Sequence, residues 1–392
     1  MHLPPRRGSR ELTRPAAVDE GASTGLPSTP PWQSLPHRAA RRWTRDVPRT
    51  PVIPAELRRG PFHIDDAERA GVSHHRLRGA SYRRLYPRVW VHTGHVMTEA
   101  CWWRAALLHA PDDAMFTGAT GLQRLGLDLG PHLPIQMVVP RDLHRDVDDI
   151  VFHRTECLPD NEDRTVCPEA VFAEICRWFS LPEAVAAGDW LLAQEHMTIR
   201  SLHRFCERDD WRAGAWEARQ VSRLLDARSR SIPESKTRVH FWAAGLPAPE
   251  VNAPVLVDGR AVALADWLWR LFRLAAEYEG GHHQSDRSQY LKDLDRYRIF
   301  RRIDLDYVQV TAEHSPTSAV LAVYRRLVAN GYAGPPPNFG PGFQGLTEPV
   351  PLTLPRFGLG APDPTGRYAP LFTAGPATVG TSKHAASRPV ER

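Results

Sequence analysis

VNAPVLVDGRAVALADWLWRLFRLAAEYE, at residues 251–279, is the stretch that decides the fold expected for the C-terminal half of this chain. It is rich in β-branched, aromatic and small apolar residues, which favour extended backbone. Its spacing predicts three consecutive strands, at 251–257, 261–267 and 273–278. Strands that follow each other this closely pair most simply as neighbours in one sheet.

The flanking segments complete a mixed α/β unit at 231–330. A helix is expected at 233–244, because proline occupies its first turn and Gly245 follows its end. Further along, the pattern predicts a long helix at 288–301, a strand at 307–311 and a closing helix at 317–329. The order helix, three strands, helix, strand, helix predicts an α/β fold of the mixed α+β kind.

Four acidic residues of this unit form its most informative set. Asp266 falls on the second expected strand, Glu277 and Glu279 on the third, and Glu234 on the preceding helix. Because strand side chains alternate between faces, Glu277 and Glu279 point the same way, and a hairpin brings Asp266 beside them. Such carboxylates offer the oxygen ligands that Mg²⁺ prefers, so we expect a Mg²⁺ site of Asp266, Glu277 and Glu279. The alternative is a set of solvated or salt-bridged surface acids.

Two histidines, His282 and His283, follow these acids after a Gly-Gly pair. A neutral imidazole in this place can serve as a general base or contact a phosphate. The alternative is a pair of polar loop residues. The candidate catalytic residues are therefore the two histidines together with Glu234, Asp266, Glu277 and Glu279.

Residues 56–95 show the pattern of a small winged helix-turn-helix. Two short helices are expected at 66–70 and 74–78, joined by a Gly-containing turn. The run YRRLYPRVWV at 82–91 predicts a two-stranded wing. Arginines on a recognition helix and a wing contact phosphates and base edges, with an ordinary basic surface as the alternative. The candidate DNA-binding residues are Arg76, Arg78, Arg83, Arg84 and Arg88.

Proline marks the outer limits of the expected folded part. Of 36 prolines, 10 lie in residues 1–55 and 12 in residues 334–392. Both ends lack periodic apolar patterns, so we expect a disordered, basic, Pro-rich tail at 1–55 and a disordered Pro/Gly-rich tail at 331–392. The segment at 96–230 is expected to be a mixed, mainly helical linking domain.

Composition excludes several classes of protein. The formal net charge of +5, from 50 Lys+Arg and 45 Asp+Glu, permits nucleic-acid binding without arguing strongly for it. No stretch reaches the roughly 18 uncharged apolar residues of a membrane span, and the start lacks the apolar core of a secretory signal. The five cysteines contain no CxxC pair, which disfavours disulfide frameworks and zinc knuckles. We therefore expect a cytoplasmic protein without membrane contact.

Three motifs of the C-terminal unit occur in a fixed order. They are IPESKTR at 232–238, Asp266 placed 11 residues before the EYEG of 277–280, and DRSQYLKDLDR at 286–296. In order and spacing they resemble a bacterial family similar to very-short-patch repair endonucleases, of the PD-(D/E)XK, restriction-endonuclease-like superfamily. Glu279 stands where that family has Asp, and the superfamily's lysine after the third-strand acid is missing, with Lys292 the nearby candidate.

The N-terminal half is similar to a second group of proteins. AGVSHHRL at 70–77 and YRRLYPRVWV at 82–91 look like the helix and wing of AbiEi-type antitoxins. In actinobacterial members such a winged helix precedes the nuclease-like domain. The two resemblances together cover roughly residues 57–330.

The resemblance implies an αβββαβ core that hydrolyses a phosphodiester of double-stranded DNA with Mg²⁺ as its cofactor. It implies that Asp266 and Glu277 hold the ion, that Glu234 and Glu279 complete or orient the site, and that one of the two histidines helps to activate water. The rival interpretation is a non-catalytic AbiEi-type antitoxin or transcriptional regulator. Its nuclease fold is then degenerate, and a cognate toxin is its partner.

Overall fold

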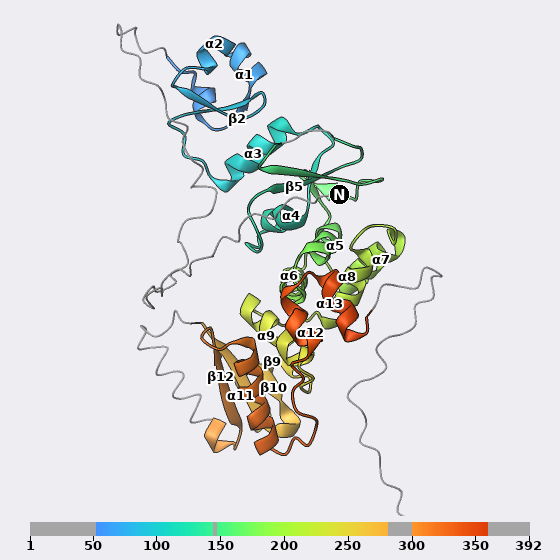
Figure 1. Cartoon of the computed structure of the whole chain (residues 1–392). Helices are drawn as coiled ribbons and strands as arrows, with labels where there is room; N and C mark the ends of the chain where they lie inside the picture. Colours follow the sequence, from blue (N-terminus) through green and yellow to red (C-terminus); the bar gives the residue numbers. More distant parts are fainter. Residues whose placement is uncertain (1–51, 144–146, 281–299, 360–392) are drawn as a thin grey trace, which may run out of the picture.

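The computed structural model describes residues 52–143, 147–280 and 300–359. Within these ranges the chain forms three sheets and a group of helices that follow one another along an elongated body (Figure 1). The N-terminal unit lies at one end, the C-terminal sheet lies at the other, and a helical region lies between them. The fold is mixed α/β, as the sequence predicts. No helix of the described ranges has the length and apolar character that crossing a membrane requires.

A small winged helix forms the N-terminal unit. Its elements are η2 (Ala55–Arg58), β1 (Phe62–His63), α1 (Ile64–Arg69), α2 (His74–Leu77), β2 (Tyr82–Tyr86) and β3 (Val89–His92). The strands form an antiparallel sheet of order β1-β3-β2. Ser73 caps α2, because its side-chain oxygen accepts a hydrogen bond from the Arg76 N–H. Leu77, Tyr82 and Trp90 are buried between helices and sheet, so the arginines beside them are fixed on an ordered frame.

The middle of the chain begins with a five-stranded sheet of order β6-β5-β4-β8-β7. Its elements are α3 (Glu99–His109), β4 (Met115–Phe116), α4 (Gly118–Leu125), β5 (Ile135–Val139), β6 (Ile150–Arg154), β7 (Asn161–Glu162) and β8 (Thr165–Val166). The helical region follows with α5 (Pro168–Trp178), α6 (Leu181–Ala193), α7 (Ile199–Arg208), α8 (Ala215–Val221) and η3 (Ser222–Leu224). The largest buried apolar cluster lies among these last helices and α4.

The C-terminal unit has the predicted strands in the predicted order. Its elements are α9 (Ile232–Ala243), β9 (Glu250–Val257), β10 (Arg260–Trp269), η4 (Arg270–Phe272), β11 (Leu274–Glu279), β12 (Asp306–Thr311) and α11 (Pro316–Ala329). The sheet order is β12-β11-β10-β9, with β9, β10 and β11 antiparallel and β12 parallel to β11. Phe241 of α9 packs edge-on against Trp267 and Trp269, which holds the helix to one face of the sheet. Nearly all of the helix expected at 288–301 lies outside the described residues.

The chain after α11 is folded as far as the structure describes it, so the tail boundary expected at residue 331 is wrong for residues 331–359. The segment forms α12 (Pro341–Gln344), η5 (Gly345–Thr347), α13 (Val350–Thr353) and η6 (Leu354–Phe357). Leu346, Val350 and Leu354 are buried in the apolar cluster of the helical region, and the Val350 N–H donates to the Phe179 carbonyl at 2.9 Å. Pro341, Pro351 and Pro355 stand in the first turns of these short helices, where proline is well tolerated.

His240 joins α9 to this returning segment and makes stability depend on pH. Its ring lies 5.9 Å from that of Phe343, and burial, with a smaller effect of the Lys236 charge, lowers the pKa of His240 to about 4. The folded state therefore disfavours the proton, so stability is fully present above the ordinary histidine pKa of about 6.5 and is lost as pH falls toward the folded pKa. Between about pH 7.5 and pH 5, we expect this residue alone to lower the free energy of unfolding by about 2 kcal/mol.

The pH effect can be measured by urea denaturation of the wild type and of His240→Gln at both pH values. The variant should lose about 2 kcal/mol less than the wild type between the two conditions. An equal loss in both proteins would contradict the assignment to His240.

Candidate functional site

Asp266 and Glu277 lie next to each other where the ladder between β10 and β11 ends. The last regular pair toward that end is Trp267 with Ala276. One residue further, the Asp266 Oδ2 atom accepts a hydrogen bond of 2.8 Å from the Tyr278 N–H, so a side chain takes the place of a backbone acceptor. This contact holds the Asp266 carboxylate against the backbone of β11, immediately beside Glu277.

Glu277 is held from the opposite side by the neighbouring parallel strand. The Tyr307 hydroxyl of β12 donates to the Glu277 Oε2 atom at 3.2 Å. Glu277 is half-buried, as is Asp266. Glu279 follows on the same strand two residues later, which places it on the same face as Glu277. The predicted neighbourhood of the strand acids is therefore present for Asp266 and Glu277.

A polar row crosses the sheet at this level. On β9, Asn252 lies between Val251 and Ala253, which pair with Trp267 and Ala265 and so place Asn252 opposite Asp266. Asn252 has a left-handed φ of 43°. Ala265 and Leu268 belong to the same apolar cluster although they are three positions apart, so the alternation of side chains is interrupted around Asp266. The left-handed backbone at Asn252 and the interrupted alternation at Asp266 thus place two polar side chains side by side, where a regular sheet would have apolar ones.

Glu234 reaches this row from helix α9, but through a hydrogen-bonded amide. Its Oε2 atom accepts hydrogen bonds from the Asn252 Nδ2 at 2.8 Å and from the Arg230 N–H at 3.0 Å. The residue is only 7% exposed. Its observed contacts are those of a buried residue that ties α9 to β9 and to the preceding loop, which differs from the expectation that it completes a set of metal ligands.

The fit of this site to Mg²⁺ rests on two acids. Among residues 52–143, 147–280 and 300–359, no three or more His, Cys, Asp or Glu side chains come close enough together to hold a metal ion. The convergence expected for Asp266, Glu277 and Glu279 is therefore absent from this part of the chain, and His282, His283 and Lys292 lie outside the described residues. Mg²⁺ in phosphate chemistry is commonly bound by one or two carboxylates, waters and substrate phosphates, which the pair Asp266 and Glu277 fits.

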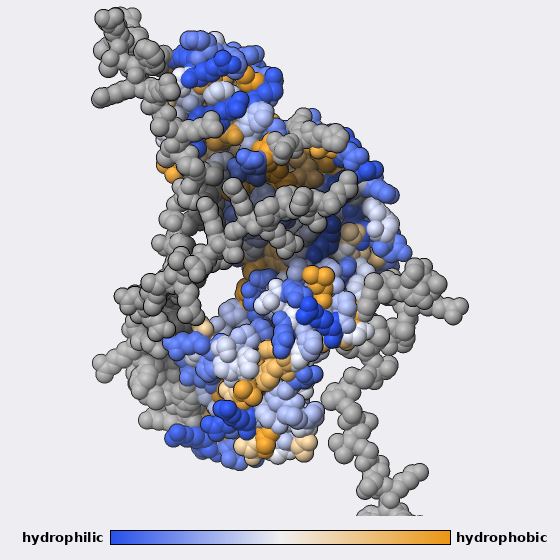
Figure 2. Space-filling model, viewed as in Figure 1, coloured by the Kyte–Doolittle hydropathy of each residue, from blue (hydrophilic) through white to orange (hydrophobic). Residues whose placement is uncertain are grey.

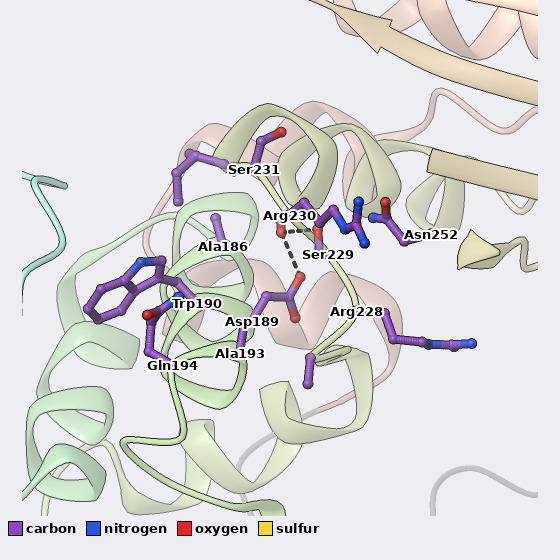
Figure 3. A pocket seen from close by; sticks show the side chains of 13 residues that line it. Ala186, Asp189, Trp190, Ala193, Gln194, Arg228, Ser229, Arg230, Ser231 and Asn252 are labelled. Atoms are coloured by element: carbon purple, nitrogen blue, oxygen red, sulfur yellow. Dashed lines mark hydrogen bonds between the residues drawn. The ribbon is translucent and has the colours of Figure 1, made fainter. Parts of the chain in front are cut away.

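A buried ion pair beside this region was not foreseen from the sequence. Asp189 of α6 is 1% exposed, and it accepts hydrogen bonds from the Arg238 guanidinium at 2.7 Å, the Ser235 hydroxyl at 2.6 Å and the Asp226 N–H at 2.7 Å. Ser235 and Arg238 belong to the IPESKTR motif, so two of its polar residues fasten α9 to the helical region. Figure 3 shows Asp189 and its hydrogen-bond network at the wall of a pocket.

That pocket has a volume of about 470 Å³ and lies between the helical region and the C-terminal unit. Its walls come from α6, which contributes Trp190, from Gln194 directly after that helix, from the loop at 227–231, from the start of α9, and from Asn252 of β9 (Figure 3). Because Asn252 also bonds Glu234 and lies opposite Asp266, the pocket opens beside the polar row of the sheet.

The five arginines of the winged helix differ in their freedom to bind a ligand. Arg88 at the wing turn donates to Asp65 Oδ1 at 2.7 Å and to His63 Nε2 at 3.1 Å. Arg76 donates to the Val52 carbonyl at 3.0 Å, and burial lowers the pKa of Arg83. Arg78 and Arg84 are exposed, and in the described part of the chain no acid forms an ion pair with either. The face of this unit at the top of Figure 2 is largely hydrophilic.

Comparison with known proteins finds two relatives in Mycobacterium tuberculosis. They are the uncharacterized protein MT2308 of strain CDC 1551 / Oshkosh and the uncharacterized protein Rv2248 of strain ATCC 25618 / H37Rv, each 26% identical over 146 residues. The match covers 37% of this chain and 54% of each relative, so it spans about half of the relatives' length. No family model matches the chain. These names state no activity.

Proposed function

We propose that this chain is a cytoplasmic DNA-binding protein whose C-terminal unit hydrolyses a phosphodiester with the help of Mg²⁺. The observation that supports it most directly is the adjacency of Asp266 and Glu277 at the end of the β10–β11 ladder. A mixed sheet with β12 parallel to β11 surrounds the pair, and an exposed pair of arginines on the N-terminal unit offers contacts for duplex DNA. The two acids lie on the C-terminal unit and the two arginines lie on the N-terminal unit of the same chain.

In this mechanism, Asp266 and Glu277 would supply two oxygen ligands to Mg²⁺. Bound Mg²⁺ would polarise the scissile phosphate and lower the pKa of a water molecule. The Tyr278 N–H holds one carboxylate in place, and the Tyr307 hydroxyl holds the other. Glu234 positions Asn252 and does not contact the reacting atoms in this scheme. The two carboxylates are kept from rotating, which lowers the cost of assembling the site around a phosphate.

The proposal is tested by incubating the full-length protein with supercoiled plasmid, linear duplex and single-stranded DNA. Each substrate is tested with Mg²⁺, with Mn²⁺ and with EDTA. Cleavage that needs the ion and stops in EDTA is the expected result. If the protein binds duplex DNA yet cleaves none of the substrates with either ion, the hydrolytic proposal fails and the binding function below remains.

The second candidate function is non-catalytic regulation by duplex binding, in the manner of an antitoxin with a cognate toxin as partner. The exposure of Arg78 at the end of α2 and of Arg84 on β2 favours it. Residues at the end of a short helix and on a wing strand are well placed to contact DNA phosphates and bases. This function needs neither Asp266 nor a metal ion.

Replacing both arginines, Arg78→Ala with Arg84→Ala, should weaken duplex binding and reduce its salt dependence. Each phosphate contact contributes about −0.9 to the slope of log K against log[salt], so losing two should make the slope less steep by about 2. Mobility shifts or anisotropy at several salt concentrations measure this change. Arg88→Ala is the matched control, because Asp65 already holds that side chain. An unchanged slope in the double variant would rule these two arginines out as phosphate contacts.

A further inference from the structure

A second pocket, of about 370 Å³, opens in the middle of the chain, away from both candidate sites. Its walls come from β5 and β6 on one side, from α5 on another, and from the loop at 211–213. A pocket of this size is within the range that holds a small organic group. The sequence assigns this region no role beyond linking the two terminal units.

Two unusually exposed tryptophans border this pocket. Trp178 is 53% exposed and Trp211 is 49% exposed, and no other tryptophan in the described part of the chain is as exposed. Trp211 lines the pocket directly. The Trp178 ring lies 6.4 Å from the ring of His153, which lines the pocket wall. Leaving such large aromatic surfaces in water costs hydrophobic stabilisation, so their position calls for a role in binding.

Both indole rings are held in place from one side. The Arg177 guanidinium carbon lies 4.9 Å from the centroid of the Trp178 ring, and that of Arg212 lies 4.7 Å from the centroid of the Trp211 ring. Glu174 holds Arg177 at 2.9 Å. The Trp178 Nε1 atom also donates to Glu174, at 2.8 Å. The tryptophans are thus braced platforms that need little ordering when a second planar group stacks on them.

The pocket interior offers hydrogen-bonding groups of both kinds. The Nε2 atom of His153 is buried and has no hydrogen-bond partner among the described residues; Glu174 Oε1 lies 3.9 Å away, beyond hydrogen-bond distance. Burial, as the largest cause, lowers the pKa of His153 and so favours a neutral ring. Thr117 also lines the pocket, and Arg154 lies at its edge, where Asp142 pairs with it at 3.1 Å. This combination suits a planar heteroaromatic group.

We propose that this pocket binds an unpaired nucleotide of single-stranded DNA. A base stacks on Trp211 and a neighbouring base stacks on Trp178, while the exposed Arg154 lies where it can exchange Asp142 for a phosphate. Single-strand binding surfaces combine aromatic platforms with basic side chains in this way, and stacking is tolerant of base identity. The proposed DNA-binding protein would use this site to contact single strands, which its duplex-binding arginines do not recognise. Neither Asp266 nor Glu277 takes part in this binding.

Fluorescence anisotropy of a labelled twelve-nucleotide oligo(dT) tests the proposal with the full-length protein in EDTA. We expect Trp178→Ala with Trp211→Ala to weaken single-strand binding roughly 10- to 100-fold. The double variant Trp178→Phe, Trp211→Phe should stay within about threefold of the wild type, because phenylalanine keeps a stacking face. Leu271→Ala is the control, since that exposed side chain lies on the C-terminal unit.

Duplex binding, measured in the same samples, reports whether the variants are folded. If the alanine variant loses duplex binding as well, the double variant Trp178→Leu, Trp211→Leu takes its place in the single-strand assay. Leucine preserves the bulk of the side chain but offers no aromatic face for stacking. Failure of the wild type to bind oligo(dT), or equal binding by the wild type and a folded non-aromatic variant, overturns the proposal. The latter result is expected if the tryptophans instead contact a protein partner. A missing nuclease activity would leave this inference untouched, since its readout is binding.

Discussion

Asp266→Asn will reduce metal-dependent cleavage by at least roughly 100-fold while leaving duplex binding within about twofold of the wild type. Asparagine keeps an oxygen that can accept the hydrogen bond from the Tyr278 N–H, so the end of the β10–β11 ladder is preserved. It loses the negative charge through which a carboxylate binds a divalent cation more strongly than a neutral amide oxygen does. The substitution therefore separates the chemical role of this carboxylate from its structural role.

The measurement is the initial rate of plasmid cleavage in Mg²⁺ and in Mn²⁺, with calorimetric titration of Mn²⁺ as a second readout. Asp304→Asn is the matched control, because Asp304 is an exposed acid of the same unit whose partner is Arg273. The control should cleave at the wild-type rate. A wild-type rate in Asp266→Asn would show that the acid pair is not the site of hydrolysis.

Asp189→Ala will lower the free energy of unfolding by about 3–5 kcal/mol, because it leaves the Arg238 charge without its buried partner. The carboxylate accepts three hydrogen bonds, and the substitution removes the acceptor for all of them. The Asp226 N–H and the Ser235 hydroxyl are among the donors affected. Unsatisfied buried polar groups are costly, so neighbouring contacts will not compensate for the loss.

Urea denaturation measures this change, with Arg228→Ala as the control. The exposed side chain of Arg228 pairs with the partly buried Asp226 in the adjacent loop, at 2.7 Å. A pair whose cation stays solvated contributes little, so the control should lose less than about 1 kcal/mol. A loss below about 1 kcal/mol for Asp189→Ala would mean that water or another group satisfies Arg238 when the acid is removed.

The strands of the C-terminal unit and the wing could be located from the sequence because their signals are local. Runs of β-branched and aromatic residues lie within each strand, and the helix at Ile232–Ala243 begins with its own cap and proline. The shortest strands carried no such signal. β4 and β8 have two residues each. β4 pairs with the longer β5, and β8 pairs with β4 and with the equally short β7, so both depend on contacts distant in the sequence.

The candidate site was only partly accessible to sequence reasoning. The pairing of two consecutive strands as a hairpin placed Asp266 close to Glu277. The role of Glu234 did not follow, because its hydrogen-bond partner Asn252 belongs to no motif. The partners of Asp189 lie 46 and 49 positions away in the chain, and no local pattern reports a contact over that separation.

The return of the chain onto the helical region limits how the C-terminal sheet can move. One connection leads from η3 into α9, and a second leads from α11 to α12, where the Asn338 N–H also donates to the Ala244 carbonyl. A unit with one connection to its neighbour can rotate about that connection in any direction. A unit with two connections can mainly rotate about the line that joins them. A single cut between Tyr332 and Pro341 would remove the second connection and leave α9, with the Asp189–Arg238 ion pair, to hold the acid row to the helices.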